Sequence, residues 1–198
     1  MLEMFLASWR IPVLSYNRPY LVIENFLFYA RIEVIASDEK AVKLLRQDRV
    51  TEAGTLIGLL AKKKAREYNR GQDLQLDVRD EDAGISQEYL TRVIDELVDN
   101  AFKFSEAGTP VVVSVHSSSD GLSVTIRDSG RGMTLKEVAR IGASMQFNRR
   151  MFEQQGTGLG LTIAQRLVKI HGGTMRIESK QGIGTTVTLN LPSTPVEN

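Results

Sequence analysis

The spacing of hydrophobic positions divides the chain into predicted helices and strands. Hydrophobic residues recur at intervals of three and four, the period of a helix with one buried face, over residues 21–35, 50–68, 86–104 and 159–171. Runs rich in β-forming residues, bounded by turn-forming residues, predict strands at 74–78, 111–115, 122–127, 174–179 and 185–191. From about residue 50 onward the chain therefore mixes helices with mainly antiparallel strands. This pattern predicts an α/β sandwich in which helices cover one face of a mixed, mostly antiparallel sheet, preceded by a helical segment.

The longest predicted helix carries a first candidate site. Ser86 is its predicted N-cap. Glu96, Asn100 and Lys103 share one narrow strip of this helix, next to its apolar stripe, and so are expected to edge a cleft. An acid, an amide oxygen and an ammonium on one strip suit a metal–phosphate site, because the amide oxygen is a ligand for Mg²⁺ and lysine pairs with phosphate. A solvated helix flank has the same pattern, so the strip alone leaves both interpretations open.

Two glycine-containing segments are further candidates. Residues 128–133 follow a predicted strand and precede a capping box at 134–137. The Asp128 carboxylate could accept a hydrogen bond from an exocyclic amine, although an ordinary turn has a similar composition. Residues 156–161 enter a helix, where backbone N–H groups form an anion site. They lack the ending of a P-loop and the context of a dinucleotide fingerprint, and a glycine-rich hinge explains them equally well.

Composition and charge exclude several classes of protein. The 25 Lys+Arg and 24 Asp+Glu residues give a net charge of +1, which argues against a dedicated nucleic-acid binder. The absence of cysteine excludes a disulfide framework, an iron–sulfur site and a cysteine nucleophile, and two histidines are a poor ligand supply for a transition metal. The sequence has neither an uninterrupted apolar stretch of about 20 residues nor the features of a signal peptide, so no membrane span and a cytoplasmic location are expected.

Taken in order, the three clusters carry a family resemblance. Residues 96–105, 128–133 and 156–161 resemble the N, G1 and G2 boxes of the ATP-binding domain that sensor histidine kinases, gyrase, Hsp90-type chaperones and mismatch-repair ATPases share. Residues 182–186 resemble the further glycine box of histidine kinases, and Phe147 lies where those kinases carry a phenylalanine box. The resemblance covers about residues 51–191, and residues 99–105 resemble the histidine kinase branch in particular.

The resemblance implies ATP and Mg²⁺ as cofactors and gives roles to individual residues. Asn100 would bind Mg²⁺, Glu96 would polarise the attacking group, and Lys103 would contact a phosphate. Asp128 would recognise the adenine amino group. The implied nucleotide-binding positions are Asp128, Gly130, Gly132, Met133, Phe147, Gly156, Thr157, Gly158, Leu159, Gly160 and Thr186. Residues 143–155 match a lid over the nucleotide, in which Arg149 and Arg150 either reach the γ-phosphate or belong to a solvated basic loop.

The family's phosphoacceptor histidine has no counterpart that fits its pattern. His116 is expected on the solvent side of a hairpin, and His171 at a helix end, where a cation would interact with the helix dipole. Residues 23–33 are similar to the second helix of the family's dimerisation hairpin. We therefore expect a partial dimerisation region at 1–50, a catalytic domain at 51–192 and a disordered tail at 193–198.

These features predict a histidine kinase catalytic domain that phosphorylates a histidine outside the chain. Expected partners are a histidine-bearing dimerisation domain, a response regulator receiver domain and a second copy of the chain bound through the N-terminal helix. The apolar face of that helix could instead dock onto its own catalytic domain. Alternative functions are a self-contained ATPase and a non-catalytic nucleotide-binding signalling module. An anti-sigma-type serine kinase shares the same boxes but fits residues 23–33 less well.

Overall fold

The computed structural model describes residues 18–119, 121–143 and 159–193. Four helices and a short 3-10 helix accompany the first strand: α2 (Arg18–Ala36), α3 (Glu39–Leu45), α4 (Ala53–Glu67), η1 (Gly71–Asp73), β1 (Leu74–Val78) and α5 (Gln87–Phe104). The remaining elements are β2 (Val111–Ser118), β3 (Gly121–Asp128), α6 (Leu135–Ala143), α7 (Leu159–Ile170), β4 (Thr174–Lys180) and β5 (Gly184–Pro192).

The five strands form one sheet in the order β1-β2-β3-β5-β4. β1 pairs with β2 in parallel, and the other three pairings are antiparallel, which confirms the predicted mixed sheet. β3 is the central strand, and its last residue, Asp128, pairs with Val111 at the start of β2 and with Thr185 at the start of β5. The sheet therefore presents Asp128 at one end, between two strand beginnings.

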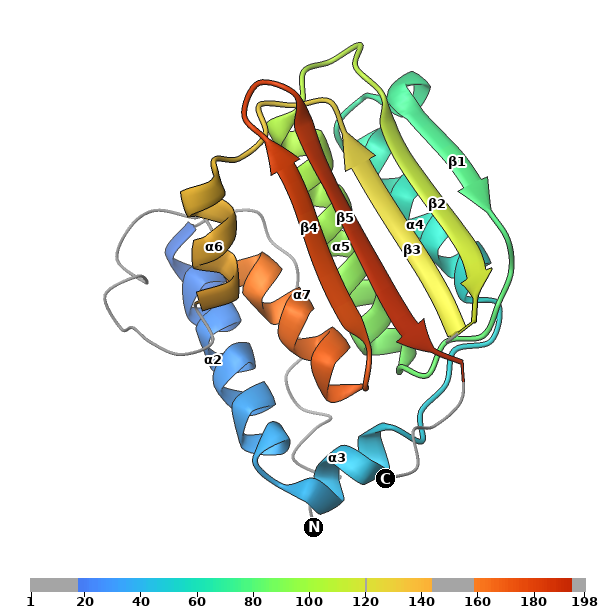
Figure 1. Cartoon of the computed structure of the whole chain (residues 1–198), viewed down its shortest axis with the longest axis vertical. Coiled ribbons are helices and arrows are strands. Elements are labelled where there is room, and N and C mark those ends of the chain that lie inside the picture. Colours follow the sequence, from blue (N-terminus) through green and yellow to red (C-terminus); the bar gives the residue numbers. More distant parts are fainter. Residues whose placement is uncertain (1–17, 120, 144–158, 194–198) are drawn as a thin grey trace.

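Helices α4, α5 and α7 cover one face of this sheet, and α2 lies alongside α7 (Figure 1). The predicted apolar stripe of α5 is buried in the core, together with Phe102, which follows it on the helix. Alternate residues of β2, β3 and β5 face the same core, among them Val113, Val124 and Leu189. The Ser86 hydroxyl accepts the N–H of Tyr89, which confirms the predicted N-cap.

The N-terminal helix α2 has one buried face and one exposed face. Ile32 is 1% exposed and belongs to the core, whereas Val34 is 71% exposed. Ile23 and Leu27 are also exposed. Part of α2 thus packs against the hydrophobic core, and part of its apolar surface remains uncovered. No helix within the described residues is long and apolar enough to cross a membrane.

Helix α3 was not predicted from the sequence, and the prediction of a positively charged His171 was wrong. Asp38 caps α3 by accepting the N–H groups of Lys40 and Ala41, a local signal that could have identified this helix. His171 follows α7, as expected, but it is 1% exposed and packs edge-on against Tyr89. Burial lowers the pKa of His171, so the ring is held neutral instead of acting as a cation at the helix end.

Candidate functional site

Helix α5 brings the predicted clusters together. Its carboxyl-terminal residue, Phe104, contacts the loop that follows β3, because the Arg131 N–H donates to the Phe104 carbonyl at 3.1 Å. Two turns earlier, the carboxylate of Glu96 lies against the first turn of α7 at Gly160. The three boxes that are far apart in the sequence therefore meet along one helix.

Asn100 has an arrangement that suits a Mg²⁺ ligand. Its Nδ2 donates to the backbone carbonyl of Glu96 at 2.7 Å, one turn earlier in α5. This bond fixes the orientation of the amide group and leaves Oδ1, the hard oxygen donor that Mg²⁺ prefers, as the ligating atom. Phosphate oxygens and water would supply the remaining ligands, as is usual for Mg²⁺ in nucleotide sites.

Glu96 is a half-buried acid held by an arginine. Its Oε1 lies 2.8 Å from Nη2 of Arg92, one turn earlier in α5. A Cβ atom at position 160 would lie under 3.0 Å from Oε2, so only glycine leaves room for this carboxylate. Burial raises the pKa of Glu96, and the nearby Arg92 charge opposes that rise. The acid is thus confined between α5 and the start of α7.

Asp128 is positioned to accept a hydrogen bond at the end of β3. Its Oδ1 accepts the N–H of Gly130 at 2.8 Å, which orients the carboxylate. A carboxylate has acceptor sites beyond this bond, so it can also accept from a donor such as an exocyclic amine. Burial raises the pKa of Asp128, while the N–H groups of Gly130 and Thr185 oppose the rise. Backbone N–H groups therefore hold the Asp128 carboxylate in place at the end of β3.

The loop after β3 is held by backbone contacts on both sides. A Cβ at position 130 would overlap the Phe104 carbonyl, and Gly132 has φ 60° with its Cα against the Lys180 carbonyl. The Arg131 carbonyl accepts the N–H of Gly182 at 2.7 Å, and the Met133 N–H donates to Ser179 Oγ at 2.8 Å. The loop is consequently fixed between α5 and the β4–β5 turn.

Two cations flank the aromatic ring at the end of α5. Lys103 Nζ lies 5.3 Å from the centroid of the Phe104 ring, and the Arg131 guanidinium carbon lies 4.4 Å from it. Both cationic side chains are exposed. Lys103 was predicted from the sequence as a site residue, but Arg131 was not. The prediction for this loop rested on the two glycines on either side of position 131.

One predicted residue lies on the wrong side of the sheet. Side chains alternate between faces along a strand, and Val187 and Leu189 of β5 point into the core. Thr185 therefore shares the face of its partner Asp128, and Thr186 points to the opposite, uncovered face. The structure brings Thr185 to the site instead of Thr186, and Thr185 Oγ1 lies 2.9 Å from Ser179 Oγ.

Several predicted positions lie outside the described residues. These are Phe147, Gly156, Thr157, Gly158, Arg149 and Arg150, together with most of the predicted lid. Leu159 and Gly160, at the other end of the glycine-rich segment, begin α7 as expected. The backbone N–H groups in the first turn of this helix are the structural basis for binding an anion.

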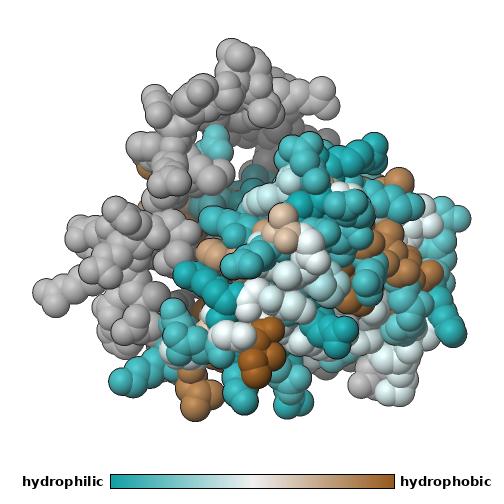
Figure 2. Space-filling view, turned by 90° about the horizontal axis from the view of Figure 1, so that it is seen from above, coloured by the Kyte–Doolittle hydropathy of each residue, from teal (hydrophilic) through white to brown (hydrophobic). Residues whose placement is uncertain are grey.

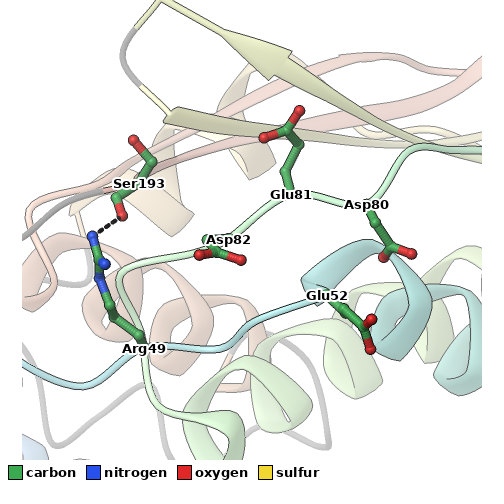
Figure 3. Close-up of a pocket in the computed structure, with 6 residues that line it drawn as sticks. All are labelled: Arg49, Glu52, Asp80, Glu81, Asp82 and Ser193. Atoms are coloured by element: carbon green, nitrogen blue, oxygen red, sulfur yellow. Dashed lines mark hydrogen bonds between the residues drawn. The ribbon is translucent and has the colours of Figure 1, made fainter.

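The two ends of the sheet differ in their surface features. Viewed from the end at which β3 finishes, the coloured surface is mainly hydrophilic (Figure 2). At the opposite end of the sheet, a cavity of about 440 Å³ is lined by Arg49, Glu52, Asp80, Glu81, Asp82 and Ser193 (Figure 3). Asp80 accepts the N–H and hydroxyl of Thr55 and so caps α4. Four carboxylates make this cavity unsuitable for a phosphate.

Comparison with known sequences identifies related proteins. Residues 85–195 match the family described as histidine kinase-, DNA gyrase B-, and HSP90-like ATPase. The histidine protein kinase DivJ of Caulobacter vibrioides is 36% identical over 111 residues, which are 52% of this chain and 17% of that protein. The sensor histidine kinase WalK of Bacillus subtilis is 36% identical over 117 residues, which are 54% of this chain and 18% of that protein. The matched segments thus span about a fifth of these relatives or less.

Solved structures show the same fold. The mycobacterial sensor histidine kinase MprB superimposes with a TM-score of 0.60 and 25% identity, covering 75% of this chain and all of that chain. The Acinetobacter baumannii histidine kinase AdeS superimposes with a TM-score of 0.61 and covers 97% of this chain and 91% of that chain. Its identity of 15% supports a shared fold alone.

Proposed function

This chain belongs to the histidine kinase-, DNA gyrase B-, and HSP90-like ATPase family, and we propose that it transfers the γ-phosphate of Mg²⁺-bound ATP to a histidine outside residues 1–198. The observation that carries the proposal is the convergence on α5 of an amine-recognising carboxylate, Asp128, with a metal-ligating amide, Asn100, and an acid, Glu96. Phosphoryl transfer depends on positioning and charge neutralisation more than on covalent chemistry by the protein. The site supplies both.

Each residue has a role that follows from its contacts. The Asp128 carboxylate accepts the adenine amino group, and Thr185 donates its backbone N–H to the same carboxylate. Gly130 and Gly132 let the loop that follows Asp128 pack against the carbonyl groups of Phe104 and Lys180. Lys103 and Arg131 provide positive charge at the mouth of the site. The chain thus binds the base by shape and hydrogen bonding and the phosphates by charge.

The phosphate end combines Asn100, Glu96 and the start of α7. Asn100 Oδ1 would hold Mg²⁺, and the bound ion would neutralise phosphate charge. The first turn of α7 orients the phosphates through its N–H groups. Glu96 polarises the attacking group and receives its proton.

Neither histidine of this chain suits the role of phosphoacceptor. His171 is buried, and its Nδ1 lies 2.7 Å from the Leu167 carbonyl. His116 is partly exposed on the uncovered face of the sheet, where its Nε2 lies 3.4 Å from Asp77 Oδ2. The site lies on the other, helix-covered side of the sheet, so a histidine from a dimerisation domain is the proposed acceptor.

The exposed stripe of α2 supports self-association as part of this proposal. Ile23, Leu27 and Val34 follow one another at spacings that place them on one side of the helix. A second copy of the chain would cover them and form a homodimer. The further partners would be a histidine-bearing dimerisation domain and a response regulator receiver domain, in the cytoplasm where ATP is available.

Titration with ATP and Mg²⁺ tests the proposed function. Parent protein should bind ATP, and Asp128→Asn should weaken binding on the order of tenfold to a hundredfold, because an amide cannot replace the charged acceptor. Asp77→Asn, on the exposed side of β1, is the matched control and should bind like the parent. Absence of binding at millimolar ATP, or equal affinity of the Asp128 variant and the parent, would refute the proposal.

The stability of the same variant gives an independent check. Because burial raises the pKa of Asp128 in the folded state, parent stability falls as the pH rises through that pKa. Asp128→Asn lacks this fall, so at neutral pH the variant should unfold at a urea concentration equal to or above that of the parent. Lost ATP binding with retained stability then assigns the defect to recognition instead of folding.

A further inference from the structure

Arg92 contacts both the N-terminal helix and the acid of the proposed site. Its Nη2 donates to Asn25 Oδ1 of α2 and lies 2.8 Å from Glu96 Oε1. Its guanidinium carbon is 5.7 Å from the centroid of the Phe28 ring, also in α2. One nitrogen atom thus joins α2 to the carboxylate of Glu96.

The carboxylate of Glu96 has little freedom on its other side. Its Oε2 lies against Gly160 in the first turn of α7, at a distance that excludes a Cβ atom. Arg92 on one oxygen and the α7 backbone on the other therefore set the orientation of the acid. A change in the position of either neighbour would move it.

The same N-terminal helix also contacts α7. Glu33 of α2 forms two close contacts with Arg166: Oε1 lies 2.8 Å from Nε, and Oε2 lies 2.9 Å from Nη2. Helix α2 therefore contacts both helices that surround Glu96. It contacts α5 through Asn25 and α7 through Glu33.

The packing between α2 and α5 is incomplete around Arg92. A cavity of about 340 Å³ separates the two helices there, with the acidic side chains of Glu24, Glu88 and Asp95 in its lining. Within the described residues, Arg92 Nε and Asp95 Oδ1 are buried without a hydrogen-bond partner. Arg92 Nε therefore keeps an unused donor at a cavity whose lining contains three carboxylates.

We propose that Arg92 is a positioning residue for Glu96 and that α2, through Asn25, holds it in the productive arrangement. The proposal rests on the function proposed above, because it takes Glu96 as the acid that acts on the attacking group. A displacement of α2 would release Arg92 toward the acidic cavity and leave Glu96 misoriented. The state of the N-terminal segment would in this way control the phosphate end of the site without touching ATP.

The kinetic test measures cleavage of the ATP γ-phosphate by the full chain, whether the phosphate passes to water or to protein. Arg92→Gln should lower the rate at saturating ATP between about tenfold and a hundredfold, because a misplaced group costs that much. Arg92→Lys should keep the ATP affinity of the parent without recovering its rate, since lysine keeps the charge but lacks the planar guanidinium that packs over Phe28 and presents Nη2 to both Asn25 and Glu96. Asn25→Ala should lower the rate while the ATP affinity is unchanged.

Glu24→Gln is the matched control, because Glu24 lines the same cavity from the same helix. This variant should cleave ATP at the parent rate. A parent-like rate in Asn25→Ala would overturn the proposal, and so would full recovery of the rate in Arg92→Lys. An equal loss of the ATP cleavage rate in Glu24→Gln and Asn25→Ala would also contradict the proposal. The effect would then belong to the cavity and not to the Asn25–Arg92 bond.

A second measurement separates this inference from the proposed function. Urea unfolding of Asn25→Ala, Glu96→Gln and the double variant should give non-additive shifts in midpoint, because Arg92 couples the two positions. The same set in an Arg92→Gln background should be additive. Additive shifts in both backgrounds would overturn the coupling through Arg92, whether or not the protein binds ATP. Non-additive shifts in a protein that does not bind ATP would support the Asn25–Arg92–Glu96 contact and refute only the kinase proposal.

Discussion

At its carboxyl end, α5 is fastened by backbone contacts and by the buried Arg70, whereas in its middle the acid Glu96 is held through Arg92 by the side chains of another helix. Arg70 donates to the carbonyl oxygens of Phe102, Ser105, Glu106 and Thr109. Asp73 in turn binds Arg70 Nε at 2.6 Å, and the Arg70 hydrogen bond holds the pKa of Asp73 below its usual value. Three of the last four carbonyl groups of α5 are thus paired outside the helix ladder: that of Ala101 with the Ser105 hydroxyl, that of Phe102 with Arg70 and that of Phe104 with the Arg131 N–H.

The middle of α5 shows the opposite balance. Buried polar atoms of Arg92 and Asp95 remain unpaired within the described residues, and a cavity adjoins them. Contacts there run between side chains of different helices, which can rotate, instead of through the backbone. The end of α5 that would recognise the base is therefore fixed by backbone contacts. The middle of α5, which would act on the phosphate, instead depends on side chains that can change their positions.

Arg70→Ala should cause the largest loss, roughly 3 kcal/mol or more, because several buried carbonyl groups lose their donor together. Urea or thermal denaturation measures the change. Arg176→Ala is the control, since Arg176 forms an exposed ion pair with Glu178 and its removal should alter stability by less than about 1 kcal/mol. Similar losses in the two variants would mean that the end of α5 is not specially fastened.

Gly130→Ala should cost about 1–3 kcal/mol, because its Cβ would overlap the Phe104 carbonyl and a backbone atom cannot rotate away. ATP affinity should fall with it, as the loop carrying Asp128 shifts. Gly71→Ala, where nothing lies within 4 Å of the added atom, should be tolerated. Denaturation and ATP titration of both variants test this, and an unaffected Gly130 variant would contradict a preformed pocket.

Tyr68→Phe should cost about 1 kcal/mol at neutral pH, since Tyr68 donates to Asp99 at 3.1 Å. Burial, followed by the Asp99 charge, raises the pKa of Tyr68 to about 12. Between pH about 10 and 12 the unfolded chain releases this proton and the folded chain does not, so parent stability falls across that window. Stability measured against pH should lack that part of the fall in the phenylalanine variant; an identical alkaline decline would show that Tyr68 does not cause it.

Gly160→Ala should change stability least, within about 1 kcal/mol, because alanine is the better helix former and the overlapping atom is a movable carboxylate. Cleavage of ATP should nevertheless fall, since Glu96 is displaced. Gly58→Ala, whose added atom meets only Leu76 Cδ1 at 4.0 Å, is the matched control in α4 and should gain stability without altering cleavage. A stability loss in Gly160→Ala as large as in Gly130→Ala would erase the contrast between the two parts of α5.

Local patterns were sufficient to predict most of the elements and the order of the ATP-binding boxes. The helical period placed α5 and its buried stripe, Ser86 capped it, and Thr134 and Glu137 bond to each other as their spacing predicted. These features depend on interactions within three or four residues, which the sequence displays directly. Glu96, Asn100 and Asp128 could be named as candidates for the same reason, because each lies in a short motif.

Contacts between distant segments decided the rest. A single position of strand register separates Thr185 from Thr186, and only the pairing of β3 with β5 selects the residue beside Asp128. Burial of His171 against Tyr89 removed a charge that its place in the sequence suggested. The bond of Arg92 to Asn25 joins residues 67 positions apart, and the space for Glu96 depends on a glycine of another helix. No local period encodes such contacts, because they arise only when helices and strands pack against one another.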